Sequence, residues 1–284
     1  MGFAGGRMHN LENYPVLGGP GFSLPNLNAM KRVEIRSGED AIGLAALGIN
    51  LRIHDPVAAG DHCRTRIYFE QSIKPRKLLI ELSPRTLEAD IVLGGAYGLN
   101  GSLKLNGSRC CYIDMGSAHK ASYGLIHLMS DNGVFYFGRE ATANHFVTTC
   151  KGQGNALLIG EDCMLATEIL INPTDFHAVV DLETNEILNE AKGPTRPIII
   201  HPHVWLGGRA IIMKGVTIGA GSVVAAASVV TRSLPDRVVA GGNPARVLRT
   251  NASWTRNLLP SVAEIEQIKE RLDTSWIAPD QTGV

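Results

Sequence analysis

The stretch IHPHVWLGGRAIIMKGVTIGAGSVVAAASVV, residues 200–230, decides the fold. A large aliphatic residue returns at every sixth position, and the fourth position after each of the first five is small or β-branched. A period of six fits neither an amphipathic helix nor a single amphipathic strand. It fits short strands that are separated by tight bends and wound into a solenoid, with coils stacked about 4.8 Å apart. The two sets are Ile200, Leu206, Ile212, Ile218, Val224 and Val230, and Val204, Ala210, Val216, Ser222 and Ser228.

The same phase occurs upstream at Ile159, Leu165 and Ile171 and then breaks, because 29 positions separate Ile171 from Ile200. Residues 175–196, which lie inside this break, are mostly polar. We expect them to form a loop that protrudes from the solenoid. Long excursions from a regular scaffold tend to carry function.

The chain is expected to be mainly β, in three parts. Residues 1–90 read as a less regular, β-rich N-terminal region of unknown function, with strands near 66–69 and 77–82. Residues 91–250 form the β-helix, irregular at first, and residues 251–284 form a helical tail. A helix is expected from Ser261 to Leu272, because the apolar residues between them have helical spacing. It packs either on its own solenoid or on a neighbouring subunit.

Composition excludes several classes of protein. The chain has 27 Lys plus Arg and 27 Asp plus Glu, so nothing in its charge suggests a nucleic-acid partner. The purest apolar run, 223–230, is far shorter than the roughly 20 residues of a membrane span. The five cysteines are odd in number and form no C-x-x-C pair. We therefore expect reduced thiols, a cytoplasmic protein and no metal.

Several motifs resemble the hexapeptide-repeat acyltransferases: PIIIHPHVWLG at 197–207, GVTIG at 215–219, SVVTR at 228–232 and GNPARVLR at 242–249. The segment TDFH at 174–177, followed by DLET at 181–184 and ILN at 187–189, is similar to bacterial capsule and polysaccharide O-acetyltransferases. The resemblance covers residues 155–250 well and residues 90–155 loosely. It implies a left-handed parallel β-helix, a homotrimer with active sites between subunits, and acetyl-CoA as cosubstrate.

The same resemblance implies the catalytic residues. His177 matches the family's general base, and an imidazole titrates close to working pH. Asp175 lies two residues earlier and is expected to orient the imidazole through a hydrogen bond. Trp205 matches a tryptophan beside the thioester, and the backbone N–H of Gly208 would face the oxyanion.

The resemblance also implies a coenzyme-binding set near the C-terminal end of the solenoid. Arginine suits the phosphates of coenzyme A because its guanidinium is planar and always charged. Ala226 and Thr231 match positions that contact the pantetheine and the nucleotide, and Arg232, Arg246 and Arg249 would meet the phosphates.

The acceptor stays open at this point. A sugar or polysaccharide hydroxyl is the first hypothesis, and a small molecule such as an antibiotic or an amino sugar is the second, so O- and N-acetylation are not separated. A third reading is a non-catalytic trimeric scaffold. A fourth is a metal-dependent hydratase that uses His177, His201 and His203, although the last two are only two residues apart and zinc needs three converging ligands.

Overall fold

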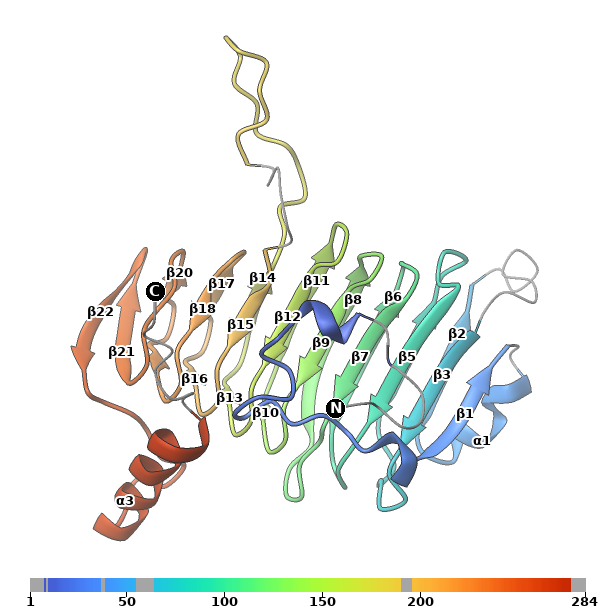
Figure 1. Cartoon of the computed structure of the whole chain (residues 1–284), viewed down its shortest axis with the longest axis horizontal. Coiled ribbons are helices and arrows are strands. Elements are labelled where there is room, and N and C mark those ends of the chain that lie inside the picture. The colour runs from blue at the N-terminus through green and yellow to red at the C-terminus, as the bar shows by residue number, and fades with distance from the viewer. Residues whose placement is uncertain (1–7, 9, 37–38, 55–63, 190–195, 277–284) are drawn as a thin grey trace.

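The computed structural model describes residues 8, 10–36, 39–54, 64–189 and 196–276. Its strands form three sheets that run side by side along one elongated body (Figure 1). Sheet I contains β1 (Lys31–Ile35), β3 (Arg64–Phe69), β5 (Glu88–Leu93), β7 (Cys110–Asp114), β9 (Val134–Phe137), β12 (Ala156–Ile159), β15 (Ile198–Ile200) and β18 (Thr217–Ile218). Sheet II contains β2 (Ile49–Ile53), β4 (Leu78–Leu82), β6 (Leu99–Leu105), β8 (Ser122–Met129), β11 (Phe146–Lys151), β14 (Ile169–Asn172), β17 (Ile211–Met213) and β20 (Val229–Val230). Sheet III contains β10 (Thr142–Ala143), β13 (Met164–Leu165), β16 (Trp205–Leu206), β19 (Val223–Val224), β21 (Val238–Gly242) and β22 (Ala245–Thr250).

The chain visits the sheets in the fixed order I, III, II, which makes a three-walled coil. β12, β13 and β14 form one coil, β15, β16 and β17 the next, and β18, β19 and β20 the one after. Strand pairs are parallel along the body, and the two antiparallel pairs, β1 with β3 and β21 with β22, close its ends. The expected solenoid of short strands is therefore confirmed. The three edges of the body are named here by the sheets that they join: I–III, III–II and II–I.

The interior is filled by the six-residue repeat. All six repeating aliphatic residues, from Ile200 to Val230, have no measurable exposure. The small residues at the fourth position are buried beside them, with at most 1% exposed. Full burial of an aliphatic side chain contributes about 1.5–3 kcal/mol, so this ladder is a major source of stability. Both sets point inward as the sequence predicted.

The coil begins well before the expected boundary near residue 90, so the division at that point was wrong. β2 pairs with β4, and β3 with β5, in the same parallel arrangement as the later strands. In these first coils the third side holds turns instead of strands. A buried ion pair, Arg76 Nη1 to Asp114 Oδ2 at 2.6 Å, fills one of these corners. The six-residue period is absent there because the third strand is absent.

A segment near the N-terminus lies across the outer surface of sheet I (Figure 1). Tyr14 and Phe22 pack there against Val92, Val134 and Leu158. The central strands β7, β9 and β12 of sheet I are consequently buried on both faces, and residues 134–137 are apolar throughout, as expected for a doubly covered parallel sheet. This segment contains the short helices η1 (Leu11–Asn13) and η2 (Leu27–Ala29), and η3 (Glu39–Ala41) and α1 (Ile42–Ala45) follow β1.

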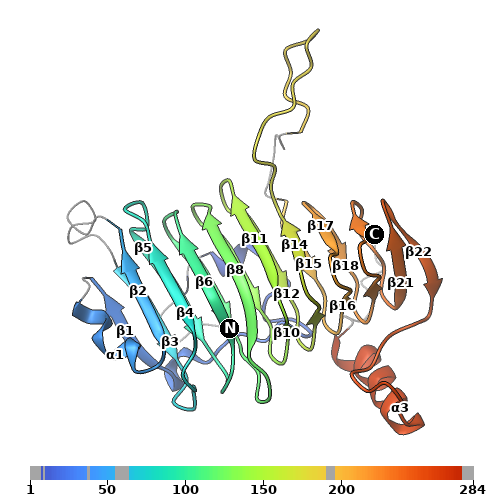
Figure 2. The ribbon, with the colours of Figure 1, turned by 180° about the vertical axis from the view of Figure 1, so that it is seen from behind.

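Two features leave the body. The loop after β14 projects far from the II–I edge, as predicted, and is seen from both sides in Figures 1 and 2. Helix α3 (Val262–Arg271) follows sheet III and lies near the I–III edge. Its N-cap Ser261 forms a capping box with Glu264. The helical turn η5 (Leu272–Trp276) follows, and its Leu272 and Trp276 pack on Ala220. The tail is thus fastened to its own solenoid. None of the described helices is long and apolar enough to cross a bilayer.

Candidate active site

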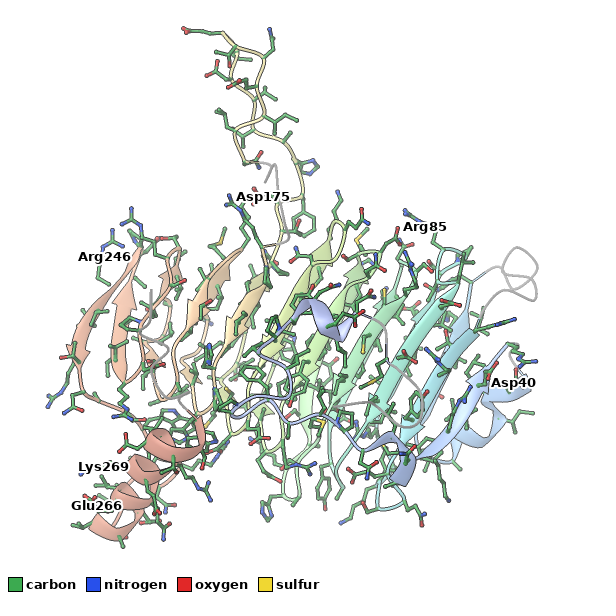
Figure 3. The ribbon with its side chains drawn as sticks, viewed as in Figure 1. Asp40, Arg85, Asp175, Arg246, Glu266 and Lys269 are labelled. Atoms are coloured by element: carbon green, nitrogen blue, oxygen red, sulfur yellow. The ribbon has the colours of Figure 1, made fainter. Side chains whose placement is uncertain are left out.

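His177 stands on the protruding loop, away from the body. Its side chain is exposed, and neither ring nitrogen has a partner among the described residues. The described part of the loop forms a hairpin, in which Val180 and Ile187 form an antiparallel bridge. Figure 3 marks Asp175 at the base of this loop. His177 therefore carries an imidazole that is free to meet a substrate or another subunit.

The expected hydrogen bond from Asp175 to the His177 ring is not present among the described residues. The Oδ2 atom of Asp175 instead accepts from the Lys214 ammonium and from Asn189 Nδ2, the latter at 2.7 Å. A full positive charge and an amide are both within reach, and a charged donor binds a carboxylate more strongly than a neutral ring does. Asp175 is thus an anchor of the loop in this structure.

Trp205 and Arg249 lie in one register row on sheet III. Trp205 pairs with Val223, Val223 with Val239, and Val239 with Arg249. Three strand spacings of about 4.8 Å separate the two ends of this row. Trp205 is 36% exposed, which leaves part of its indole open to a ligand.

Gly208 and Ala226 occupy equivalent corners of successive coils at the III–II edge. The corners stack tightly, because Ala227 N donates to Gly208 O at 2.8 Å. The N–H groups of Gly208 and Ala226 have no acceptor among the described residues. Two unpaired donors one coil apart are suited to an oxyanion and to an amide carbonyl of a ligand.

The coenzyme-binding candidates lie on the last coils. Arg232 and Arg249 are exposed and form no ion pair with any described carboxylate, and Arg246 donates only to the carbonyl of Ala245. Thr231 is exposed beside Arg232. Figure 3 shows Arg246 at this end of the body. Three guanidiniums without carboxylate partners are available to bind phosphate.

One chain does not bring all of these residues together. His177 leaves from the II–I edge, between β14 and β15, whereas Trp205 is on sheet III, the wall opposite that edge. Gly208 and Ala226 lie at the III–II edge. The two edges that carry the candidate groups are therefore the two edges of sheet II.

The three histidines of the hydratase hypothesis do not converge. His203 is buried against the C-terminal segment, and its Nδ1 and Nε2 lie 2.9 Å from Asp162 Oδ2 and 2.9 Å from the carbonyl of Trp254. His201 packs edge-on against Phe22, and burial lowers the pKa of its imidazole. No cluster of three metal-ligating side chains occurs among the described residues. The geometry gives this hypothesis no support.

Sequence reasoning missed two groups near the site. Asn189 was recognised only as part of a motif, and Lys214 not at all, yet both bind Asp175. The packing of Trp254 against Trp205, with ring centroids 6.1 Å apart, was also missed. These contacts join segments that are distant in sequence and follow no repeat, and the rarity of tryptophan, three in the chain, was the only available signal.

Comparisons with known proteins agree with the repeat. Residues 197–232 match the family described as bacterial transferase hexapeptide (six repeats). The polysialic acid O-acetyltransferase of Escherichia coli O1:K1 / APEC is 40% identical over 98 residues, 34% of this chain and 31% of that protein. The galactoside O-acetyltransferase of Escherichia coli (strain K12) is 34% identical over 114 residues, 40% of this chain and 53% of that protein. The resemblance to hexapeptide-repeat transferases is therefore confirmed.

A solved structure extends the likeness of the fold. The crystal structure of the polySia specific acetyltransferase NeuO aligns with a TM-score of 0.50 and 21% identity, over 78% of this chain and 85% of that one. At this identity the match concerns the fold alone. The aligned stretches span about a third and about a half of the two curated relatives.

Proposed function

We propose that the protein transfers the acetyl group of acetyl-CoA to a hydroxyl of a carbohydrate. The observation that carries this proposal is the placement of a free imidazole at one edge of sheet II and a free backbone donor, Gly208 N–H, at the other. A base for the acceptor and a donor for the oxyanion are the two groups that acyl transfer from a thioester needs. The carbohydrate acceptor is inferred from the two relatives, named for polysialic acid and galactoside.

In the proposed reaction, His177 accepts the proton of the attacking hydroxyl while the oxygen bonds to the thioester carbonyl carbon. The Gly208 N–H donates to the oxyanion that forms. When the carbon–sulfur bond breaks, the imidazolium of His177 returns its proton to the leaving thiolate, so the enzyme ends as it began. Trp205 walls the thioester side of the pocket.

The coenzyme is proposed to lie along the last coils. The Ala226 N–H meets the pantetheine arm, Thr231 contacts the nucleotide end, and the guanidiniums of Arg232, Arg246 and Arg249 meet the phosphates. What supports this is that these side chains are exposed and form no ion pair with any described carboxylate. We place the reaction in the cytoplasm and infer that the coil is left-handed, as the family resemblance implies.

A homotrimer would complete the site. The outer face of sheet II carries a row of aliphatic side chains in register, and the central strands of sheet I are already covered by the chain's own N-terminal segment. A neighbour that packs on sheet II would bring the II–I edge of one subunit to the III–II edge of the next. His177 of one subunit would then face the Gly208 corner of another. The row consists of Leu125, Val147, Leu170, Ile211 and Val229.

Release of thiol from acetyl-CoA tests the proposal, with a panel of sialic acid oligomers, galactosides, neutral oligosaccharides and amino sugars as acceptors. We expect release with at least one hydroxyl acceptor and a loss of at least about a hundredfold in kcat for His177→Ala. The variant should keep its oligomeric state and its affinity for coenzyme A. Near-normal turnover in His177→Ala would remove this imidazole from the mechanism, and transfer only to amines would remove the O-acetylation.

A further inference from the structure

The side chain of Asn189 holds together the two limbs of the hairpin that carries His177. Its Nδ2 donates to Asp175 Oδ2 at 2.7 Å and to the backbone carbonyl of His177 at 2.9 Å. Its Oδ1 accepts from the backbone N–H of Val179 at 2.7 Å. One amide thus bonds to three alternate residues of the outgoing limb, with His177 in the middle.

Lys214 ties this amide cluster to the solenoid. It follows β17, on the coil beneath the loop, and its ammonium contacts Asp175 Oδ2 and donates to the carbonyl of Asn189 at 2.7 Å. The Lys214 and Asp175 side chains are only 21% and 29% exposed, so water screens this ion pair less than a surface pair. The base of the loop is consequently fixed to a rigid element.

Among the described residues, a further contact reaches the loop, from Lys151 Nζ to the backbone carbonyl of Phe176 at 3.4 Å. Phe176, Val179, Val180 and Leu188 are 46–60% exposed, and Leu182 at the turn is 89% exposed. The loop therefore has no apolar core of its own. Within one subunit, the described part of the loop is held mainly by the hairpin hydrogen bonds and by the cluster at its base.

We propose that Asn189 is a positioning residue for His177, with Asp175 and Lys214 as its anchor. The proposal rests on the function assigned to His177 above. Only an amide fits this place, because it must donate two hydrogen bonds and accept one. Asp at 189 would lose both donors and set a second carboxylate beside Asp175. A displacement of about 1 Å in a catalytic group can cost about a hundredfold in rate.

Asn189→Asp tests the proposal, with Asn185→Asp as its control. Both substitutions add the same charge to the same loop, but Asn185 makes no side-chain hydrogen bond among the described residues. We expect Asn189→Asp to lower kcat ten- to a hundredfold with the KM for acetyl-CoA and the melting temperature unchanged. Asn185→Asp should resemble the wild type. Lys214→Met should lower kcat in the same way, and Lys214→Arg should restore much of it.

Hydrogen exchange of the amides in 175–189 supplies a readout that needs no turnover. Asn189→Asp should speed exchange at Val179 and Leu188, whose amides are bonded within the hairpin. If the wild type transfers no acetyl group, the proposed function fails while this comparison still tests the clamp. Unchanged exchange, or faster exchange with unchanged kcat, would overturn the role given to Asn189.

Discussion

His203 and Trp254 are joined by a reciprocal pair of hydrogen bonds. The indole Nε1 of Trp254 donates to the backbone carbonyl of His203 at 2.8 Å, and the His203 ring faces the carbonyl of Trp254 at 2.9 Å. The imidazole is stacked between Trp254 and Trp276, with centroids 4.5 Å and 4.9 Å away. Since Trp254 also packs against Trp205, these contacts fasten the C-terminal segment to the coil that carries the candidate site.

Trp254→Phe should loosen this segment. The phenyl ring keeps the stacking but lacks the N–H, so the buried carbonyl of His203 loses its donor, at a cost of about 1–3 kcal/mol. The midpoint of urea denaturation should fall. Trp276→Phe is the matched control, because no hydrogen bond from the Trp276 indole occurs among the described residues. An equal shift in both variants would mean that stacking alone holds the segment.

Asp162→Asn should lower stability at neutral pH and have little effect in acid. Burial favours a raised pKa for Asp162, but the hydrogen bond from His203 and the charge of Arg256 outweigh it and hold the pKa below its ordinary value. A carboxylate with a lowered pKa in the folded state stabilises the fold above its unfolded pKa of about 3.9. This contribution disappears as the pH falls through the folded pKa. Denaturation midpoints at pH 7 and pH 3 provide the measurement, and an equal loss at both would contradict the prediction.

The sequence predicted the parts of the fold that depend on the repeat. Ile200 and its five successors are buried at the predicted phase, the loop protrudes, and the helix begins at Val262, next to the predicted Ser261. The first coils were missed because the Arg76–Asp114 ion pair occupies their third side, where later coils have a strand of sheet III. An ion pair between residues 38 positions apart leaves no periodic signal.

The candidate site was only partly predictable. Each residue could be proposed from a local motif. A motif does not specify how far apart its residues lie in space, so the sequence could not predict that the width of the body separates His177 from Trp205. The same holds for Asp175, whose partner Lys214 is 39 positions away. Whether two opposite charges on neighbouring coils meet depends on the register between those coils. The sequence gives this register only when the number of residues in each coil is known.

Gly207 and Gly208 should respond differently to substitution. A Cβ at Gly207 would lie 2.6 Å from the backbone N of Ala226, so Gly207→Ala should destabilise the protein. A Cβ at Gly208 meets nothing closer than 3.6 Å, so Gly208→Ala should be tolerated. Gly208→Pro removes the N–H and should lower kcat by about 10²–10³. Steady-state kinetics on correctly folded variants decide this, and full activity in Gly208→Pro would place the oxyanion elsewhere.

Leu170→Glu should dissociate the proposed trimer. Leu170 lies between Val147 and Ile211 in the outward row of sheet II, and a carboxylate buried there would have no partner in that aliphatic row. Light scattering after size-exclusion chromatography should report monomers, with turnover lost because each site needs two subunits. Arg85→Glu, an exposed change at an outer turn (Figure 3), is the control. A trimer that survives Leu170→Glu would move the interface away from sheet II.

Arg249→Ala should weaken coenzyme binding more than catalysis. Arg249 shares its register row with Trp205, at the far end of sheet III, and its guanidinium has no carboxylate partner among the described residues. A phosphate contact distant from the reacting carbon contributes about equally to the ground state and the transition state. Its loss should therefore raise the KM for acetyl-CoA with a smaller change in kcat. Arg139→Ala is the control, because Arg139 is also exposed and without a described ion-pair partner but lies at the I–III edge. If kcat falls and the KM for acetyl-CoA does not rise, Arg249 acts on the reacting groups and the direction assigned to the coenzyme is reversed.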